Sequence, residues 1–318
     1  MRWLFVLVAL ATSSAATAAP DPMPVEEHAG SAAGSGSTKA PALTTLTDDP
    51  VLGKASRING EEMHGLVAFT FDDGPNPATT PAVIDALEKY DIPATFFIVT
   101  RRLLGKHGEK SREVLARELA GGFTVGSHSV SHPNLKHAAG NTITKEIDNS
   151  FRTLSKEAGR PIGLFRPPYG ALSGSARVRL KQLGVTEVIW SVDTLDWKAK
   201  NAERLRKKVL RMIKEQNGGV VLMHDVKPIT AKIIGDVLDD LEAENCARLA
   251  RGDKPIVPVS LHYFLTDGPR ARGKGAPRPL PPEVSARTAA YEAALPARCA
   301  ARAPASQPTT QPSAPAQH

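Results

Sequence analysis

Short apolar runs alternate with segments of helical periodicity between residues 63 and 266. The runs are typical of strands buried on both faces, and most are followed by apolar residues at a spacing of three or four. About seven such strand–helix units occur in succession, which predicts an α/β fold with a parallel sheet. The expected strands are residues 66–71, 94–99, 123–126, 164–166, 187–192, 220–223 and 256–261.

The number of units within one domain, expected at residues 63–266, favours a closed or nearly closed, TIM-barrel-like β/α barrel. An open, doubly wound sheet is the alternative. No Gly-x-Gly-x-x-Gly follows the first apolar run, which counts against a dinucleotide-binding form of that alternative.

Polar residues cluster just after the carboxyl ends of the expected strands. In a barrel these ends converge on one face, where catalytic loops lie. We therefore expect one site built from segments that are far apart in the sequence. The clusters are Asp72-Asp73, His128 with His132, Arg166 to Tyr169, Asp193 with Asp196 and Trp197, and His224-Asp225.

His128 and His132 are four residues apart and could share one metal ion. Pro133 disfavours helical backbone at His132, so we expect the pair at a strand end and a tight turn. Two histidines and one carboxylate form a usual catalytic zinc set. The candidates for the carboxylate are Asp72, Asp73, Asp193, Asp196 and Asp225.

Asp72 and Asp73 are adjacent at the end of an apolar run. A turn of the Asp-Gly-Pro type needs only one of them. Adjacent side chains leave an extended strand in opposite directions, so we expect the two carboxylates to have different roles. One could bind the metal while the other acts as base on a metal-bound water, whose pKa the metal would lower to about 7.

Three later clusters supply a cation, an aromatic ring and a titratable group. Arg166 lies in a loop stiffened by prolines and could keep the basic aspartate ionised. Trp197 could form the wall of a sugar site. His224 ends an apolar strand and, paired with Asp196, is a candidate general acid.

Five motifs together resemble the polysaccharide deacetylases with a NodB homology domain, carbohydrate esterase family four. They are TFDDGP (70–75), HSVSH (128–132), RPPYG (166–170), DTLDW (193–197) and LMH (222–224), in the family's order. The resemblance covers roughly residues 63–265. It implies a distorted seven-stranded β/α barrel and a divalent metal, commonly zinc, with Co²⁺, Ni²⁺ or Mn²⁺ as alternatives.

The resemblance also implies a role for each motif residue. Asp73, His128 and His132 would be the metal ligands. Asp72 would be the general base, held by Arg166.

The remaining motif residues would complete the catalytic centre. His224 would be the general acid, and Asp196 would orient it. The backbone N–H of Tyr169 would stabilise the oxyanion, while Trp197 and Leu222 would line the acetyl pocket.

These roles imply a hydrolase that removes N-acetyl groups from polysaccharides containing N-acetylglucosamine, such as peptidoglycan or chitin-like glycans. An O-acetyl esterase acting on acetylated xylan-type glycans is the alternative, and a non-catalytic glycan-binding protein is a third reading. A glycosidase with paired carboxylates would leave the two histidines unexplained.

The ends of the chain differ from the middle in composition. Residues 1–18 have the positive start, apolar run and Ala-x-Ala site of a secretory signal, which predicts export to the periplasm or the exterior. No other segment is apolar enough to cross a membrane. Residues 19–62 are expected to form a flexible linker, and residues 267–318 a disordered tail rich in Pro, Ala and Arg.

Most of the formal net charge of +7 belongs to the signal and the tail, so the domain itself is nearly neutral. This distribution argues against a nucleic-acid partner. We expect an acetylated polysaccharide as the partner and a monomeric protein. Cys246 and Cys299 could pair in an oxidising compartment, but a mobile tail favours a buried Cys246 and a free Cys299.

Overall fold

The computed structural model describes residues 57–60, 65–264 and 282–302. The expected export signal at residues 1–18 lies outside the described residues, as do most of the expected linker and two parts of the expected tail. Among the described helices, none combines the length and the apolar character needed to span a bilayer.

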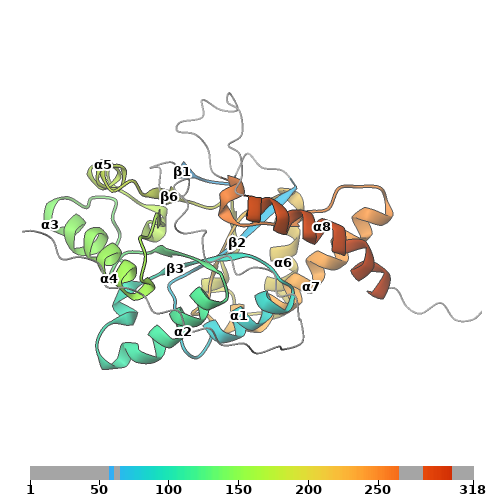
Figure 1. Ribbon diagram of the computed structural model, residues 1–318, viewed down its shortest axis with the longest axis horizontal. Coiled ribbons are helices and arrows are strands. Elements are labelled where there is room, and N and C mark those ends of the chain that lie inside the picture. The colour runs from blue at the N-terminus through green and yellow to red at the C-terminus, as the bar shows by residue number, and fades with distance from the viewer. Residues whose placement is uncertain (1–56, 61–64, 265–281, 303–318) are drawn as a thin grey trace, which may run out of the picture. The chain divides into compact units, whose positions relative to one another are not determined.

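A parallel sheet of nine strands forms the centre of the fold (Figure 1). The order is β1-β6-β5-β4-β3-β2-β8-β7, and β9 also pairs with β2. Because every pairing is parallel, the carboxyl ends of the strands lie on one side. The strands are β1 (Arg57–Ile58), β2 (Leu66–Asp72), β3 (Ala94–Ile98), β4 (Thr124–Ser127), β5 (Leu164–Phe165), β6 (Thr186–Val188), β7 (Val192–Asp193), β8 (Gly218–His224) and β9 (Val257–Pro258).

Residues 186–193 bring the two ends of this sheet together. They carry β6, which pairs with β1 and β5, and β7, which pairs with β8. The expected strand at 187–192 is thus divided between two sheet positions, and the sheet curves into a distorted barrel. This confirms the predicted α/β barrel.

One part of the expected linker was predicted wrongly. Arg57 and Ile58 form strand β1, and the side chain of Ile58 is buried in the barrel interior. Two residues are too few to show a strand period in the sequence, and β1 depends on pairing with β6.

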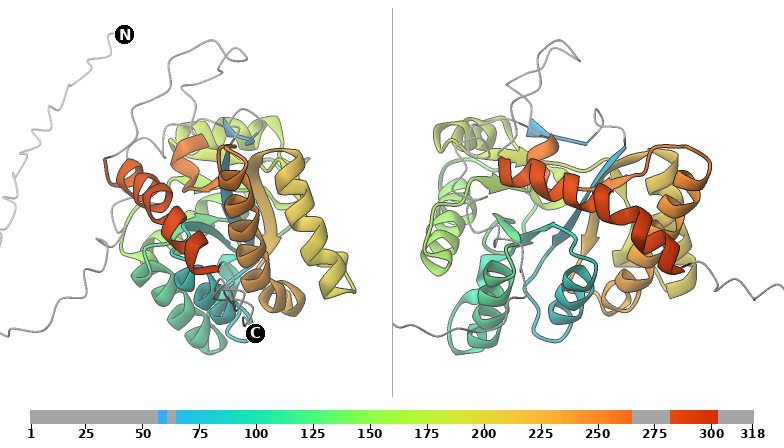
Figure 2. Two further views of the ribbon diagram at one scale, coloured as in Figure 1. Left: turned by 90° about the vertical axis from the view of Figure 1, so that its right-hand side faces the viewer. Right: turned by 45° about the vertical axis from the view of Figure 1, so that its right-hand side comes forward.

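Helices cover the outer face of the sheet (Figure 2). Most of them follow a strand and bury an apolar face, as the spacing of apolar residues predicts, whereas α8 lies in a segment that was expected to be disordered. The helices are α1 (Thr80–Lys89), α2 (Glu109–Ala120), α3 (Gly140–Ile143), α4 (Asn149–Ala158), α5 (Gly174–Gln182), α6 (Ala202–Glu215), α7 (Pro228–Ala250) and α8 (Pro282–Arg302). Short helical turns connect them: η1 (Thr100–Leu103), η2 (Lys106–Gly108), η3 (Thr144–Asp148), η4 (Pro168–Gly170), η5 (Asp196–Lys198) and η6 (Leu261–Phe264).

Strand β2 separates two apolar layers. Val67, Phe69 and Phe71 belong to the larger core cluster, which includes the apolar faces of the helices. Ala68 belongs to the smaller cluster inside the barrel. Because side chains alternate along a strand, Asp72 shares the inward face with Ala68 and lies at its carboxyl end.

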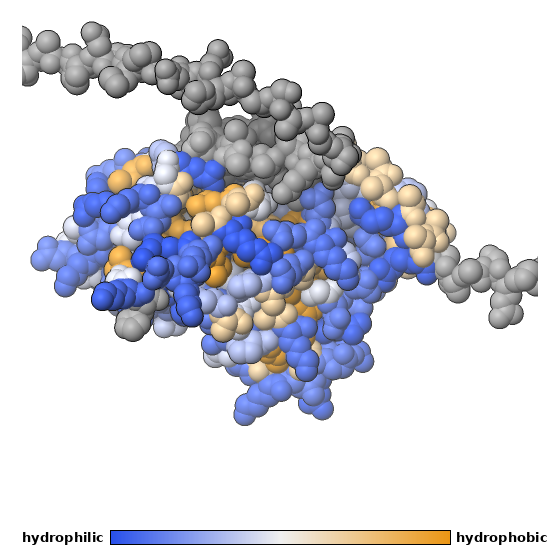
Figure 3. All heavy atoms as spheres, turned by 60° about the horizontal axis from the view of Figure 1, so that its bottom comes forward, coloured by the Kyte–Doolittle hydropathy of each residue, from blue (hydrophilic) through white to orange (hydrophobic). Residues whose placement is uncertain are grey.

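The surface is mostly polar, in contrast to the two apolar layers of the interior. On the face shown in Figure 3, hydrophilic residues cover most of the described area, and hydrophobic residues show between them. Trp197 and Tyr169 are exceptions among the described residues, because both are large rings with more than half of their surface exposed. Both belong to motifs at the carboxyl ends of strands, so their exposure marks that end of the barrel.

The expected disordered tail contains a helix, which is a correction. Helix α8 contacts α7, and the side chain of Leu295 is fully buried. Arg298 Nε lies 2.9 Å from Glu242 Oε2, and Arg302 Nη1 lies 2.7 Å from Asp239 Oδ1. Arg298 and Arg302 therefore pair with acidic residues of α7, a contact that composition alone does not reveal.

The cysteines were also predicted wrongly. Cys246 of α7 and Cys299 of α8 form a disulfide, with their Cα atoms 5.3 Å apart. The prediction of a free Cys299 rested on a mobile tail, whereas α8 is held beside α7 by buried and charged contacts. Ordered packing thus places the two thiols at bonding distance.

Candidate active site

The loops that carry the motif residues have unusual backbone conformations. Asp73, Ser129, His132, Tyr169 and Leu195 all have positive φ angles, between 56° and 76°. For residues with a side chain this region costs of order 1–3 kcal/mol, and it is concentrated at functional sites. All five lie in loops at the carboxyl ends of the strands, so the barrel is holding strained backbone where the polar clusters meet.

Asp73, His128 and His132 come together as a group. One ligand atom of each lies within 4.8 Å of the others. Asp73 Oδ1 is 3.4 Å from His132 Nε2 and 3.8 Å from His128 Nε2. Asp73 Oδ1 is buried without a hydrogen-bond partner, as expected for an atom aimed at a cation.

The orientation of His128 suits the same purpose. Its Nδ1 lies 2.7 Å from the carbonyl oxygen of Arg166, which leaves Nε2 facing the two aspartates. Burial lowers the pKa of His128 to about 3, so its imidazole is neutral at physiological pH. A neutral imidazole held through its second nitrogen is the usual state of a metal-ligating histidine. The three residues therefore fit a divalent cation.

Asp72 lies beside this group but has a different partner. Arg166 Nη1 donates hydrogen bonds of 2.7 Å to Asp72 Oδ1 and to Thr70 Oγ1. The guanidinium is fully buried and lies 4.2 Å from the ring centroid of Phe97. Burial raises the pKa of Asp72, while the charge and hydrogen bond of Arg166 partly oppose that rise. The carboxylate is therefore both basic and fixed.

His224 forms a pair with Asp196. Its Nδ1 is 2.7 Å from Asp196 Oδ1, and its backbone N–H donates to Asp196 Oδ2 at 2.7 Å. Thr230 Oγ1 donates to the same Oδ2 at 2.6 Å. Burial alone would lower the pKa of His224, but hydrogen bonding and the charge of Asp196 raise it to about 9. His224 therefore carries a proton at neutral pH.

The two halves of the site meet through the sheet. Asp72 and His224 are register partners on the adjacent strands β2 and β8. Neighbouring strands lie about 4.8 Å apart, so a basic carboxylate and a protonated imidazole stand side by side. The carboxylate of Asp72 can accept a proton, and the imidazole of His224 can donate one a short distance away.

Tyr169, Trp197 and Leu222 differ in their exposure. The ring of Tyr169 is 4.7 Å from that of His132, and the residue is 66% exposed. Trp197 is 53% exposed and lines a cleft beside Asp196. Leu222 is buried, and its carbonyl oxygen accepts a hydrogen bond from Thr194 Oγ1. The two rings thus border the site, while Leu222 lies within the barrel wall.

The remaining two candidate carboxylates, Asp193 and Asp225, have partners of their own. Asp193 Oδ1 accepts a hydrogen bond from the backbone of Leu195. Asp225 is buried and accepts a hydrogen bond from Thr80. A Cβ atom at Gly74 would lie 2.1 Å from Asp225 Oδ2, which explains the glycine that follows Asp73.

Glu146 is a supporting residue that sequence reasoning missed. Its Oε2 accepts from the backbone N–H groups of Val130 and Ser131, and its Oε1 accepts from Ser131 Oγ. These bonds fix the loop between the two histidines. Glu146 lies in η3, a π-helical turn, and such turns are frequent at functional sites. Nothing in its local sequence distinguishes it from a solvated helical glutamate.

Comparison with known proteins agrees with this geometry. Residues 59–188 match the family model described as Polysaccharide deacetylase. A chitooligosaccharide deacetylase of Azorhizobium caulinodans is 31% identical over 233 residues, which cover 73% of this chain and 99% of that protein. A peptidoglycan-N-acetylglucosamine deacetylase of Listeria monocytogenes is 33% identical over 191 residues, 60% of this chain. The chain spans only 39% of the length of that relative.

Solved structures show the same fold. A peptidoglycan deacetylase of Bdellovibrio bacteriovorus superposes with a TM-score of 0.54 at 25% identity, covering 64% of this chain and 55% of that one. The Azorhizobium protein is matched almost from end to end, and the alignment is long enough to extend beyond the family model. The chain therefore belongs to the polysaccharide deacetylase family.

Proposed function

We propose that this protein is a metal-dependent hydrolase that removes N-acetyl groups from polysaccharides containing N-acetylglucosamine. The observation that carries the proposal is the register pairing of Asp72 with His224 beside the group of Asp73, His128 and His132. A base, an acid and a set of cation ligands are the parts that amide hydrolysis by activated water requires.

Asp73, His128 and His132 would hold the cation, and Zn²⁺ suits their mixed nitrogen and oxygen donors. Co²⁺, Ni²⁺ and Mn²⁺ are the alternatives. When bound, such a cation polarises the acetyl carbonyl and makes a neighbouring water acidic.

The chain's own groups would move the protons. Asp72, kept in place by Arg166, takes a proton from the attacking water. His224, whose proton is retained by Asp196, delivers one to the nitrogen of the leaving amine. The backbone N–H of Tyr169 would donate to the oxyanion, a contribution that can reach a few kcal/mol. Trp197 and Leu222 would border the acetyl group.

We further propose that the protein acts outside the cytoplasmic membrane, in the periplasm or beyond the cell, as a monomer on cell-wall or chitin-like glycan. Two observations support this location. Two of the relatives are named for peptidoglycan, and the disulfide between Cys246 and Cys299 is typical of an oxidising compartment.

The test is acetate release by the zinc-loaded chain from N-acetylglucosamine oligomers, peptidoglycan and acetylxylan. Asp72→Asn should lower kcat by about 10²–10⁴-fold, the usual contribution of a positioned base. Asp73→Ala should abolish zinc binding together with activity. Asp193→Asn is the matched control, because Asp193 bonds only its own loop among the contacts described here.

The outcomes separate the readings. Release from acetylxylan alone would identify an O-acetyl esterase. Retention of glycan without acetate release would identify a binding protein. Full activity after removal of all divalent metal would refute the proposed mechanism.

A further inference from the structure

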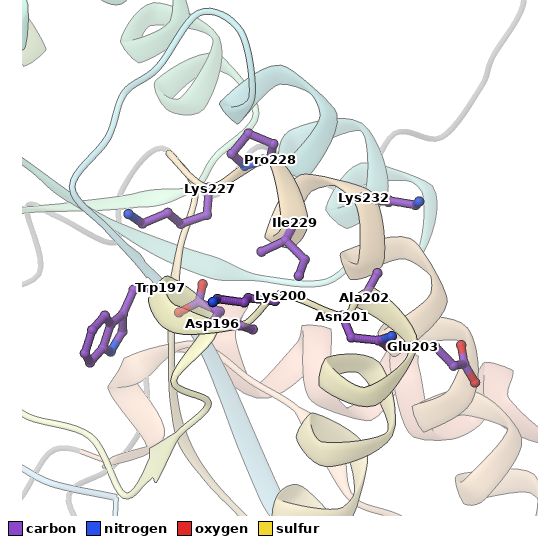
Figure 4. Close-up of a pocket in the computed structure, with 11 residues that line it drawn as sticks. Asp196, Trp197, Lys200, Asn201, Ala202, Glu203, Lys227, Pro228, Ile229 and Lys232 are labelled. Atoms are coloured by element: carbon purple, nitrogen blue, oxygen red, sulfur yellow. The ribbon is translucent and has the colours of Figure 1, made fainter.

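A cleft lies directly beside the His224–Asp196 pair, and apart from Asp196 and Trp197 its lining residues have no part in the chemistry described above. It has a volume of about 730 Å³ and is formed where η5 meets the first residues of α6 and α7 (Figure 4). Asp196 and Trp197 form one wall, and Lys227 and Pro228 form another. A glycan whose acetylated sugar lies at His224 would place a neighbouring sugar or its substituent here.

Three lysines line this cleft, and two of them lie on its side next to the active site. In Figure 4, Lys200 and Lys227 extend their amines toward the side of the Trp197 ring. Neither lysine forms an ion pair within the part of the chain that the structure describes. Asp196 does not offset them, because its side chain is fully buried and bonded to His224.

The remaining acidic residue of the cleft is also engaged elsewhere. Glu203 Oε1 lies 3.1 Å from Lys207 Nζ, and in Figure 4 its carboxylate points away from Trp197. The cleft therefore has an excess of positive charge on the side next to the active site.

Helix α7 adds to this excess. It begins at Pro228, has no acidic residue in its first turn, and has no side-chain cap at Lys227. Its dipole places a partial positive charge at the same wall, where the carboxylate that it meets is Asp196, which accepts a hydrogen bond from Thr230 and is already paired with His224. The start of α6 differs, because Asn201 Oδ1 accepts a hydrogen bond from the backbone of Arg204.

Cations also lie beside the proposed metal ligands. A second cleft of about 400 Å³ is lined by Asp73, His132, Arg101 and Arg102. Two clefts next to the candidate site thus carry basic side chains, although the globular domain as a whole is nearly neutral. This uneven distribution favours a negatively charged ligand.

Trp197 indicates the kind of molecule that carries the negative charge. The ring is 53% exposed and borders the cleft. An exposed indole offers a flat apolar surface, suited to the face of a sugar ring, together with a polar N–H. A free inorganic anion would need the lysines but not the ring.

We propose that Lys200, Lys227 and Trp197 form a subsite for a sugar that bears a carboxylate and adjoins the acetylated sugar. The preferred substrate is then an anionic acetylated glycan, and a neutral chitin-like polymer is a poorer one. This inference rests on the proposed deacetylase function and narrows its substrate class.

The experiment compares three substrates of the zinc-loaded full chain. The first is peptidoglycan glycan strands freed of peptides, in which alternate sugars carry a carboxylate. The second is the same strands with those carboxylates converted to amides. The third is a neutral N-acetylglucosamine pentamer. The variant is Lys200→Ala with Lys227→Ala. The control is Lys232→Ala, because Lys232 lines the same cleft but extends its amine away from Trp197 in Figure 4.

The wild type should have a kcat/KM about tenfold higher on the charged strands than on the amidated ones, as expected for two partly exposed ion pairs. The double variant should lose this preference through a higher KM with kcat unchanged, and its activity on the pentamer should stay the same. Lys232→Ala should retain the preference. An equal loss on all three substrates, or no loss, overturns the subsite.

Failure of the parent proposal is distinguishable. If the wild type releases no acetate from any substrate, calorimetric titration of the protein with the charged or amidated strands still tests the subsite. The subsite is supported if the wild type binds amidated strands more weakly than charged ones. It is also supported if the double variant, but not Lys232→Ala, binds charged strands more weakly than the wild type does. Equal binding in all cases overturns it.

Discussion

Asp196→Asn tests how the protein keeps a proton on His224. In the wild type the pKa of His224 is about 9, against an ordinary value of 6.5. The substitution keeps the shape of the side chain but removes its negative charge, whereas the burial of His224 remains. Because burial lowers the pKa of an imidazole, the pKa of His224 should fall to 6.5 or below.

The size of the effect depends on pH. At pH 8 an imidazole with a pKa of about 9 is roughly 90% protonated, and one with a pKa of 6.5 is roughly 3% protonated. Activity that requires this proton should therefore fall about thirtyfold more at pH 8 than at pH 5.5, where both forms are protonated. The ratio of variant to wild-type kcat/KM across this range isolates the effect of protonating His224, because every other group titrates in the same way in both proteins and cancels in the ratio.

The same shift affects stability. The pKa of His224 is raised by folding, so its contribution is fully present below pH 6.5 and is lost as pH rises through about 9. The wild-type free energy of unfolding should thus fall by up to about 3 kcal/mol over this window, at 1.36 kcal/mol per pKa unit. The variant should not show this fall.

Two measurements check the reasoning, with Asp193→Asn as control. NMR titration of the metal-free chain, with His224 assigned by its replacement, gives the pKa directly. Urea unfolding at several pH values gives the stability change. A variant-to-wild-type activity ratio that is the same at all pH values, with an unchanged pKa of His224, would refute the role given to Asp196.

Three further changes test other supports of the site. Glu146→Ala should weaken zinc binding about 10–100-fold in competition titrations with little change in fold, because it frees the loop between the two histidines, and Glu146→Gln should weaken it less. Arg166→Met should lower the urea unfolding free energy by about 3–5 kcal/mol, because Asp72 is left buried and unpaired, and adding Asp72→Asn should restore part of it. Replacing Cys246 and Cys299 by Ser should lower stability by about 2–4 kcal/mol, and dithiothreitol should then affect the wild type alone.

The barrel could be predicted because its strands have a strong local signature. Residues 66–71 and 220–223 are apolar on both faces, which only a strand covered on both sides requires. The polar residues after them had to meet, since the ends of parallel strands share one side. Asp73, His128 and His132 lie together for that reason.

The features that were missed depend on contacts that no local pattern records. Strand β1 exists only through its pairing with β6, and α8 depends on the acidic side chains of α7. Thr230 bonds Asp196 across 34 residues, and Glu146 bonds a loop 15 residues away. Threonine and glutamate in helices are too common for sequence to reveal such roles.

The register between β2 and β8 has a consequence for how this enzyme class can vary. Asp72 and His224 are neighbours because seven consecutive backbone pairs align their strands, from Leu66 with Gly218 onward. A slip of β8 by one residue would turn His224 to the face opposite Asp72. The spacing of the proposed base and acid is therefore encoded in the hydrogen-bond ladder and not in the loops. On the proposed mechanism, loops such as the one carrying Trp197 could be exchanged to change the polymer that is accepted, while the proposed acid and base keep their spacing.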